Sequence, residues 1–176
     1  VDHFVMPGET LSSDSMSVFC GGKGLNQSLA LARAGAAVYH AGRIGKDGVM
    51  LADVLIKSGV NTDYVKKTDG VTGHAIIQVN KKGQNCILLY GGENQKVTQE
   101  FAEEVLKNFK RGDWLLLQNE ISCGGTIMKS AHEKGMTIVL NPSPMNEKIL
   151  EMPLDLVDYF ILNEVEGAQI CGSEKI

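Results

Sequence analysis

The sequence predicts an α/β fold in which a mostly parallel sheet is flanked by helices and carries a small β-sheet as an appendage. Short apolar runs such as "WLLLQ" and "MTIVL" alternate with helix-like segments, a pattern typical of βα units with parallel strands. Two β-favouring runs at 72–90 interrupt this alternation and flank a polar turn at 81–84, so they predict a β-hairpin outside the main sheet. With 176 residues, 43% of them hydrophobic, the chain can form a sizeable core.

The helices are predicted from apolar residues that recur every three or four positions. In the first helix Leu25, Leu29 and Ala32 share one face, and Gly35 stands where a helix stop is expected. The predicted helices cover 25–34, 49–58, 99–109, 125–134 and 164–172, and the predicted strands cover 37–45, 114–118, 136–140 and 158–162.

Composition excludes several classes of function. A net charge of −4 gives no basic surface for nucleic acid or an anionic membrane, and no apolar run approaches the ~20 residues of a membrane span. The cysteines are scattered and form no C-x-x-C pair, which indicates reduced thiols in a cytoplasmic protein rather than disulfides or a zinc site. They stand at Cys20, Cys86, Cys123 and Cys171.

Polar residues follow three consecutive predicted strands. Asn119 and Glu120 come after "WLLLQ", Asn141 comes after "TIVL", and Asn163 and Glu166 follow "YFIL". Open parallel sheets bind ligands at the carboxyl ends of their strands, so we expect these groups to share one site. The alternative is that each of them simply caps the helix that follows.

A glycine-rich turn, Gly21-Gly22-Lys23-Gly24, opens the first helix. Bare backbone permits close approach of a ligand, the helix start offers free N–H groups, and Lys23 and Asn26 add side-chain donors. Two glycine-rich phosphate-binding patterns are excluded. The P-loop pattern requires glycine where Ser17 stands and serine or threonine where Gly24 stands, and the dinucleotide-binding pattern G-x-G-x-x-G requires glycine where Gln27 stands. A flexible turn without a ligand is the alternative.

Seven segments in this order resemble the ribokinase-like sugar kinases of the phosphofructokinase-B family: "PGETL", "GGKGLNQSLALARAGA", "GRIGKDG", "TGHAIIQVN", "LLLQNE", "LNPSP" and "ILNEVEGAQICG". The resemblance implies an α/β domain with a β-sheet lid, formed here by about 38–44 and 72–90. It implies transfer of a phosphoryl group from ATP to a sugar hydroxyl. It also implies dimerisation through the lid, no nucleic-acid or membrane partner, and a cytoplasmic location.

The resemblance also implies roles for individual residues. Gly22, Lys23 and Asn26 match the turn that binds sugar hydroxyls, and Glu120 matches a carboxylate with the same role in ribokinases. Asn163 and Glu166 match an N-x-x-E motif that orders Mg²⁺ and its waters around the ATP phosphates, so Glu166 is expected to reach the metal through water.

Parts of the family pattern are absent from residues 1–176, which we therefore interpret as a partial domain. The first strand, with its sugar-binding Asn and Asp, is expected before this sequence. The catalytic aspartate of the G-A-G-D motif, the anion hole, the adenine pocket and a monovalent-cation (K⁺) site are expected after residue 176. No catalytic residue is assigned within the chain, and the chain alone is predicted to be inactive.

D-ribose, converted to ribose 5-phosphate, is the first candidate substrate. "NQ" at 26–27 and "QNE" at 118–120 look most like ribokinase, and Glu120 would repel a phosphorylated sugar. The alternatives are a kinase for another sugar or for a fructose phosphate, a non-catalytic sugar-binding homologue, and a generic dinucleotide-binding domain.

Overall fold

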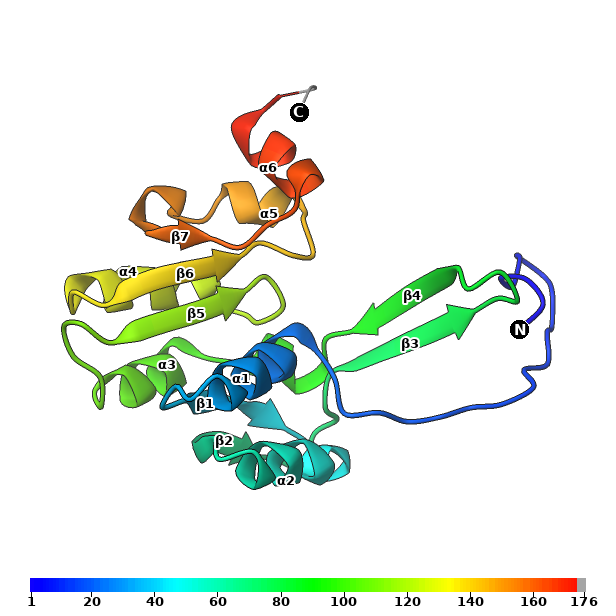
Figure 1. The fold of residues 1–176 in the computed structure, drawn as a ribbon, viewed down its shortest axis with the longest axis horizontal. Coiled ribbons are helices and arrows are strands. Elements are labelled where there is room, and N and C mark those ends of the chain that lie inside the picture. The colour runs from blue at the N-terminus through cyan, green and yellow to red at the C-terminus, as the bar shows by residue number, and fades with distance from the viewer. Residues whose placement is uncertain (174–176) are drawn as a thin grey trace.

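The computed structural model describes residues 1–173. Parallel sheets flanked by helices form the body of the molecule, and an antiparallel hairpin projects from it (Figure 1). The helices are α1 (Lys23–Arg33), α2 (Val49–Lys57), α3 (Gln99–Leu106), α4 (Gly124–Glu133), α5 (Glu147–Leu150) and α6 (Glu164–Cys171). The strands are β1 (Tyr39–Ile44), β2 (Asn61–Lys67), β3 (His74–Val79), β4 (Asn85–Tyr90), β5 (Trp114–Gln118), β6 (Thr137–Asn141) and β7 (Tyr159–Phe160). Three short 3₁₀ turns, η1 (Lys46–Gly48), η2 (Gly92–Lys96) and η3 (Leu154–Leu156), complete the described elements.

The predicted α/β architecture is confirmed, and the helices lie where their apolar periodicity placed them. Helix α1 is followed by Gly35 at φ 90° and α2 by Gly59 at φ 80°, so both end at the glycines that the sequence marks as stops. Strands β5, β6 and β7 form a parallel sheet in that order. The 72–90 hairpin stands outside it as the separate antiparallel pair β3–β4.

The structure corrects one expectation about the lid. We expected 38–44 to join the hairpin, but β1 instead pairs in parallel with β2. Sequence reasoning missed β2 because Asp63, Lys66 and Lys67 interrupt its short apolar stretch at Tyr64 and Val65. Among the described residues the strands therefore form two parallel sheets, β1–β2 and β5–β6–β7, rather than one.

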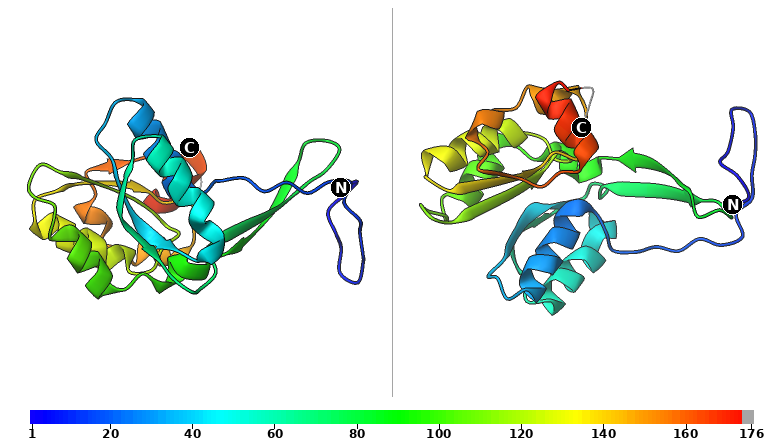
Figure 2. Two further views of the ribbon diagram at one scale, coloured as in Figure 1. Left: turned by 90° about the horizontal axis from the view of Figure 1, so that it is seen from below. Right: turned by 45° about the horizontal axis from the view of Figure 1, so that its top comes forward.

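Two separate clusters of buried side chains hold the body together. The smaller joins α1 to α2 through Leu25, Leu29 and Leu55. The larger packs α3 and α4 against the β5–β6 sheet, and Met128, Ile138 and Leu140 within it have no exposed surface. The ribbons of these two halves lie on either side of the base of the hairpin (Figure 2).

Residues 1–22 contain no helix or strand; the chain starts beside the tip of the hairpin and leads back to the body at α1 (Figure 1). The N-terminal amine of Val1 donates to the Val79 carbonyl oxygen at 3.1 Å, and Lys81 pairs with Asp2 at 2.6 Å. Within residues 1–173, no helix combines the length and the apolar character needed to cross a membrane.

Candidate functional site

The glycine-rich turn places Lys23 at the first position of α1. Gly22 precedes the helix with φ 100°, a conformation that side-chain-bearing residues rarely adopt. A Cβ built on Gly22 would meet no atom within 4 Å, so its backbone faces open space. Backbone conformation rather than crowding is therefore the reason for glycine at this position.

Lys23 reaches across to the loop after β5. Its Nζ lies 2.9 Å from Oε1 of Glu120, 97 positions along the chain. The two side chains are 33% and 22% exposed, so solvent reaches the pair only in part. They line a cavity of about 420 Å³ together with Gly22 and Asn26. The structure thus brings all four residues of the predicted sugar site to one cleft.

A second cavity, of about 290 Å³, also includes Lys23 in its wall. Its other residues come from the ends of β6 and β7 and the start of α6: Asn141, Ser143, Ile161, Leu162, Asn163 and Glu166. Polar groups after β6 and β7 therefore line this second cavity, whereas Glu120, after β5, lines the first. The three strand ends thus supply two cavities that share Lys23, rather than the single site that we expected.

Asn163 and Glu166 also perform the helix-capping role considered as the alternative. Asn163 Oδ1 accepts from the Glu166 N–H at 2.9 Å, and Glu166 Oε2 accepts from the Asn163 N–H at 3.1 Å. This reciprocal pair is a capping box at the start of α6. Capping and lining the cavity are compatible, because the box orients both side chains at the cavity wall.

Sequence reasoning missed the contribution of the hairpin to the cleft. Ala75 on β3 and Ile87 and Leu89 on β4 line the larger cavity opposite the glycine turn. Ala75 pairs with Leu89 across the hairpin, and the side chains of a strand alternate between faces, so these residues share one face. The sequence predicts the alternation of side chains along each strand, but it does not predict which face of the hairpin turns toward the glycine-rich turn.

A polar layer behind the turn fixes α1 to both parallel sheets. Ser28 Oγ lies 2.8 Å from Nδ1 of His40 on β1, and Gln118 Nε2 on β5 donates to Gln27. Burial lowers the pKa of His40 below its ordinary value of 6.5, which favours the neutral ring. The helix that carries Lys23 and Asn26 is thereby held between β1 and β5.

The oxygen atoms that line the second cavity suit a magnesium ion whose ligands are mostly water and phosphate oxygens. Carboxylate, amide and hydroxyl oxygens are the ligands that Mg²⁺ prefers. Within residues 1–173, however, no group of three or more His, Cys, Asp or Glu side chains could hold a metal. The residues fit an ion carried mainly by water and phosphate oxygens, with Glu166 as one acidic neighbour.

Comparison with known proteins assigns this chain to one family. The sequence profile of the pfkB family carbohydrate kinases matches residues 1–176. The chain belongs to this family.

The particular relatives include ribokinases and deoxyribokinases. The chain is 36% identical to the ribokinase of Staphylococcus aureus over 180 residues, covering 98% of this chain and 58% of that protein. It is 33% identical to the ribokinase of Haemophilus influenzae, covering 99% of this chain and 58% of that protein. The chain thus spans a little over half the length of these relatives.

Solved structures agree with the sequence comparison. The crystal structure of Cryptococcus neoformans ribokinase in complex with ADP matches with a TM-score of 0.82 and 36% identity, over 98% of this chain and 57% of that one. Arabidopsis thaliana ribokinase complexed with ribose and ATP matches with a TM-score of 0.78 and 29% identity, over 97% of this chain and 57% of that one. The predicted ribokinase-like fold is confirmed.

Proposed function

We propose that the full-length protein is an ATP-dependent sugar kinase and that its substrate is D-ribose, which it converts to ribose 5-phosphate. The observation that carries the proposal is the pair of adjoining cavities that share Lys23. One contains Asn26 and Glu120, and the other contains Asn163 and Glu166. Similarity to ribokinases, including structures solved with ADP and with ribose and ATP, supports it.

In this proposal the larger cavity binds the sugar. Glu120 accepts hydrogen bonds from sugar hydroxyls, Asn26 both donates and accepts, and Lys23 keeps the carboxylate in place. A phosphorylated sugar carries about two negative charges, which the Glu120 carboxylate would repel where they approach it. A neutral sugar meets no such repulsion and gains hydrogen bonds to the same carboxylate.

The smaller cavity takes the phosphates of ATP. Mg²⁺ supplies charge neutralisation on the phosphate oxygens when bound. Glu166 holds water near the ion, Asn163 fixes Glu166 through the capping box, and Lys23 offers positive charge toward the transferring group. The general base, the anion hole, the adenine pocket and a K⁺ site are proposed to lie after residue 176, so we expect no turnover from residues 1–176 alone.

The hairpin completes the proposed enzyme as a lid and as a dimer contact. Ala75 and Leu89 face the cleft, and Leu89 is 50% exposed there. Ile76, Leu88 and Tyr90 on the opposite face are 57%, 67% and 56% exposed. Exposed apolar patches of this kind mark interaction sites. All four cysteines are free, as expected for the reducing cytoplasm in which we place the protein.

The test is direct. The full-length protein is incubated with Mg²⁺, ATP and, separately, D-ribose, 2-deoxyribose, fructose or fructose 6-phosphate, and both ADP and the phosphorylated sugar are measured. D-ribose should give the highest kcat/KM. Preference for fructose 6-phosphate would favour the phosphosugar alternative, and sugar binding without ADP release would favour the non-catalytic one.

A further inference from the structure

The chain enters and leaves the hairpin through two segments that cross at its base. Residues 70–73 lead into β3 and residues 91–94 follow β4. The Glu93 N–H donates to the Val71 carbonyl oxygen at 2.9 Å, which joins the two segments. A Cβ on Gly70 would lie 2.0 Å from Oε1 of Glu93, so a larger residue at this position would force the Glu93 side chain to move. The Glu93 side chain therefore lies at the crossing itself.

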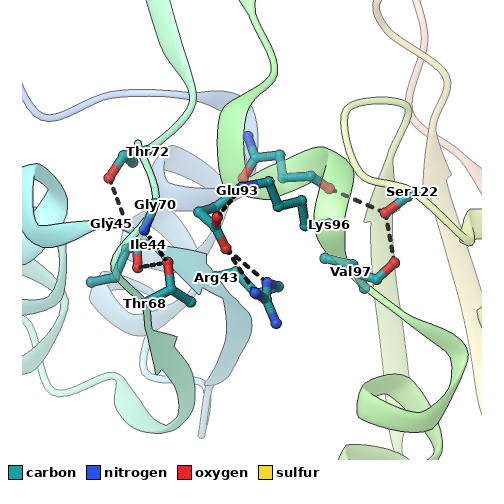
Figure 3. A network of polar contacts seen from close by, with 11 residues as sticks. Arg43, Ile44, Gly45, Thr68, Gly70, Thr72, Glu93, Lys96, Val97 and Ser122 are labelled. Carbon is teal, nitrogen blue, oxygen red and sulfur yellow. Dashed lines mark hydrogen bonds and ion pairs between the residues drawn. The ribbon is translucent and has the colours of Figure 1, made fainter.

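Glu93 is a buried carboxylate with two cationic partners. Its side chain is 2% exposed. Arg43 on β1 approaches Oε2 with Nη2 at 2.8 Å and Nε at 3.0 Å, and Lys96 Nζ lies 2.8 Å from Oε1 (Figure 3). The hydrogen bond from Lys96, aided by the one from Arg43, holds the pKa of Glu93 below its ordinary value despite burial. An ionised Glu93 thus ties η2 to the β1–β2 sheet.

The same 3₁₀ turn supports the loop that carries Glu120. Gln95 Nε2 donates to the Glu120 carbonyl oxygen at 2.8 Å. The Ser122 N–H donates to the Asn94 carbonyl oxygen at 3.1 Å, and Ser122 Oγ donates to the Val97 carbonyl oxygen at 2.6 Å (Figure 3). The turn η2 is therefore bonded on one side to Arg43 and on the other to the backbone of the sugar cleft.

We propose that Glu93 is a positioning residue for the cleft: with Arg43 and Lys96 it fixes η2, and η2 sets both the hairpin over the cleft and the backbone at Glu120. The hairpin supplies Ala75 and Leu89 to one wall, and Glu120 lies on another. A shift of η2 would displace both walls together, although Glu93 itself lines neither cavity. The expected change in the KM for D-ribose rests on the proposed function. The expected movement of the hairpin and of the Glu120 backbone rests only on the contacts of η2.

Two variants of the full-length protein test the proposal, with D-ribose as the probe. Glu93→Gln keeps the shape of the side chain and removes its charge, so the pairs with Arg43 and Lys96 weaken. Gln95→Ala removes an exposed side chain and cuts only the bond to Glu120, so it should leave the melting temperature unchanged. Each should raise the KM for D-ribose by about ten-fold, since a small misplacement is costly, and alter kcat and the KM for ATP little. Glu104→Gln, an exposed acid on α3, is the matched control.

Hydrogen–deuterium exchange separates failure of this proposal from failure of the proposed function. Glu93→Gln should speed exchange in 74–90 and 119–122, and Glu104→Gln should not. If the wild-type protein phosphorylates no sugar, the exchange experiment alone decides the structural claim. Unchanged exchange in Glu93→Gln overturns the proposal, and so does an unchanged KM for D-ribose in folded Glu93→Gln and Gln95→Ala of an active enzyme.

Discussion

Replacement of Glu120 by alanine is the most informative single change at the cleft. Glu120 is 22% exposed and pairs with Lys23 at 2.9 Å. Its remaining lone pairs are available to sugar hydroxyls, because an ionised carboxylate accepts at about four positions. Glu120→Ala removes these acceptors, and Glu120 itself does not line the cavity of Asn163 and Glu166. The change should therefore affect the sugar and spare ATP.

The expected size follows from the partial burial of the site. A charge-assisted hydrogen bond lost from a partly buried position costs about 1.5–3 kcal/mol, which corresponds to a rise in KM of roughly ten- to a hundred-fold. Loss of the partly solvated pair with Lys23 should lower the free energy of unfolding by about 1 kcal/mol or less. A binding effect larger than the stability effect distinguishes a ligand contact from a structural one.

Initial rates of the full-length protein measure this prediction. D-ribose is varied at saturating ATP, ATP is then varied at saturating D-ribose, and urea denaturation gives the stability. Glu133→Ala, an exposed acid at the end of α4, serves as the control. If folded Glu120→Ala keeps the wild-type KM for D-ribose and for every other accepted sugar, Glu120 does not belong to the site.

Three further predictions concern other parts of the molecule. Glu166→Gln can keep the capping box of α6 but loses the charge, so kcat should fall and the Mg²⁺ requirement rise in steady-state assays, while sugar affinity stays. Partial burial lowers the pKa of His40, so as the pH falls the unfolded chain binds a proton before the folded chain does. The free energy of unfolding should then fall as pH drops below 6.5, and His40→Gln should flatten this slope in urea titrations. Leu88→Asp should shift sedimentation from dimer to monomer whereas Leu150→Asp, also at an exposed site, should not; a wild-type monomer contradicts the dimer.

Much of the fold follows from local patterns. The helices were predictable because apolar residues such as Leu25 and Leu29 recur at helical spacing and glycines mark the ends. Strand β2 was not, because Asp63, Lys66 and Lys67 break its apolar run and pairing with β1 supplies what the sequence pattern lacks. The weak strand propensity of these residues is outweighed by the pairing with β1, a tertiary contact that the local sequence does not show.

The candidate site divides in the same way. The meeting of Lys23 with Glu120 was predictable, because strand ends and the glycine turn of an α/β fold converge at one edge. The support of Glu120 by Gln95 was not, because it depends on how η2 packs against the loop after β5. The charge of Glu93 gave no signal either, since an acid in a polar turn normally faces solvent.

The division of the core into two clusters has a consequence for ligand linkage. Lys23 stands on the helix packed by Leu25 and Leu29, whereas Glu120 follows the strand of the larger cluster. A ligand that contacts both residues joins two units that could otherwise open separately, and it binds only when both are folded. At a concentration about a hundred times its Kd, such a ligand adds about 2.7 kcal/mol to the folded state. Occupancy of the cleft should therefore raise the melting temperature and slow amide exchange in α1 and β5 together, so that the two units unfold as one.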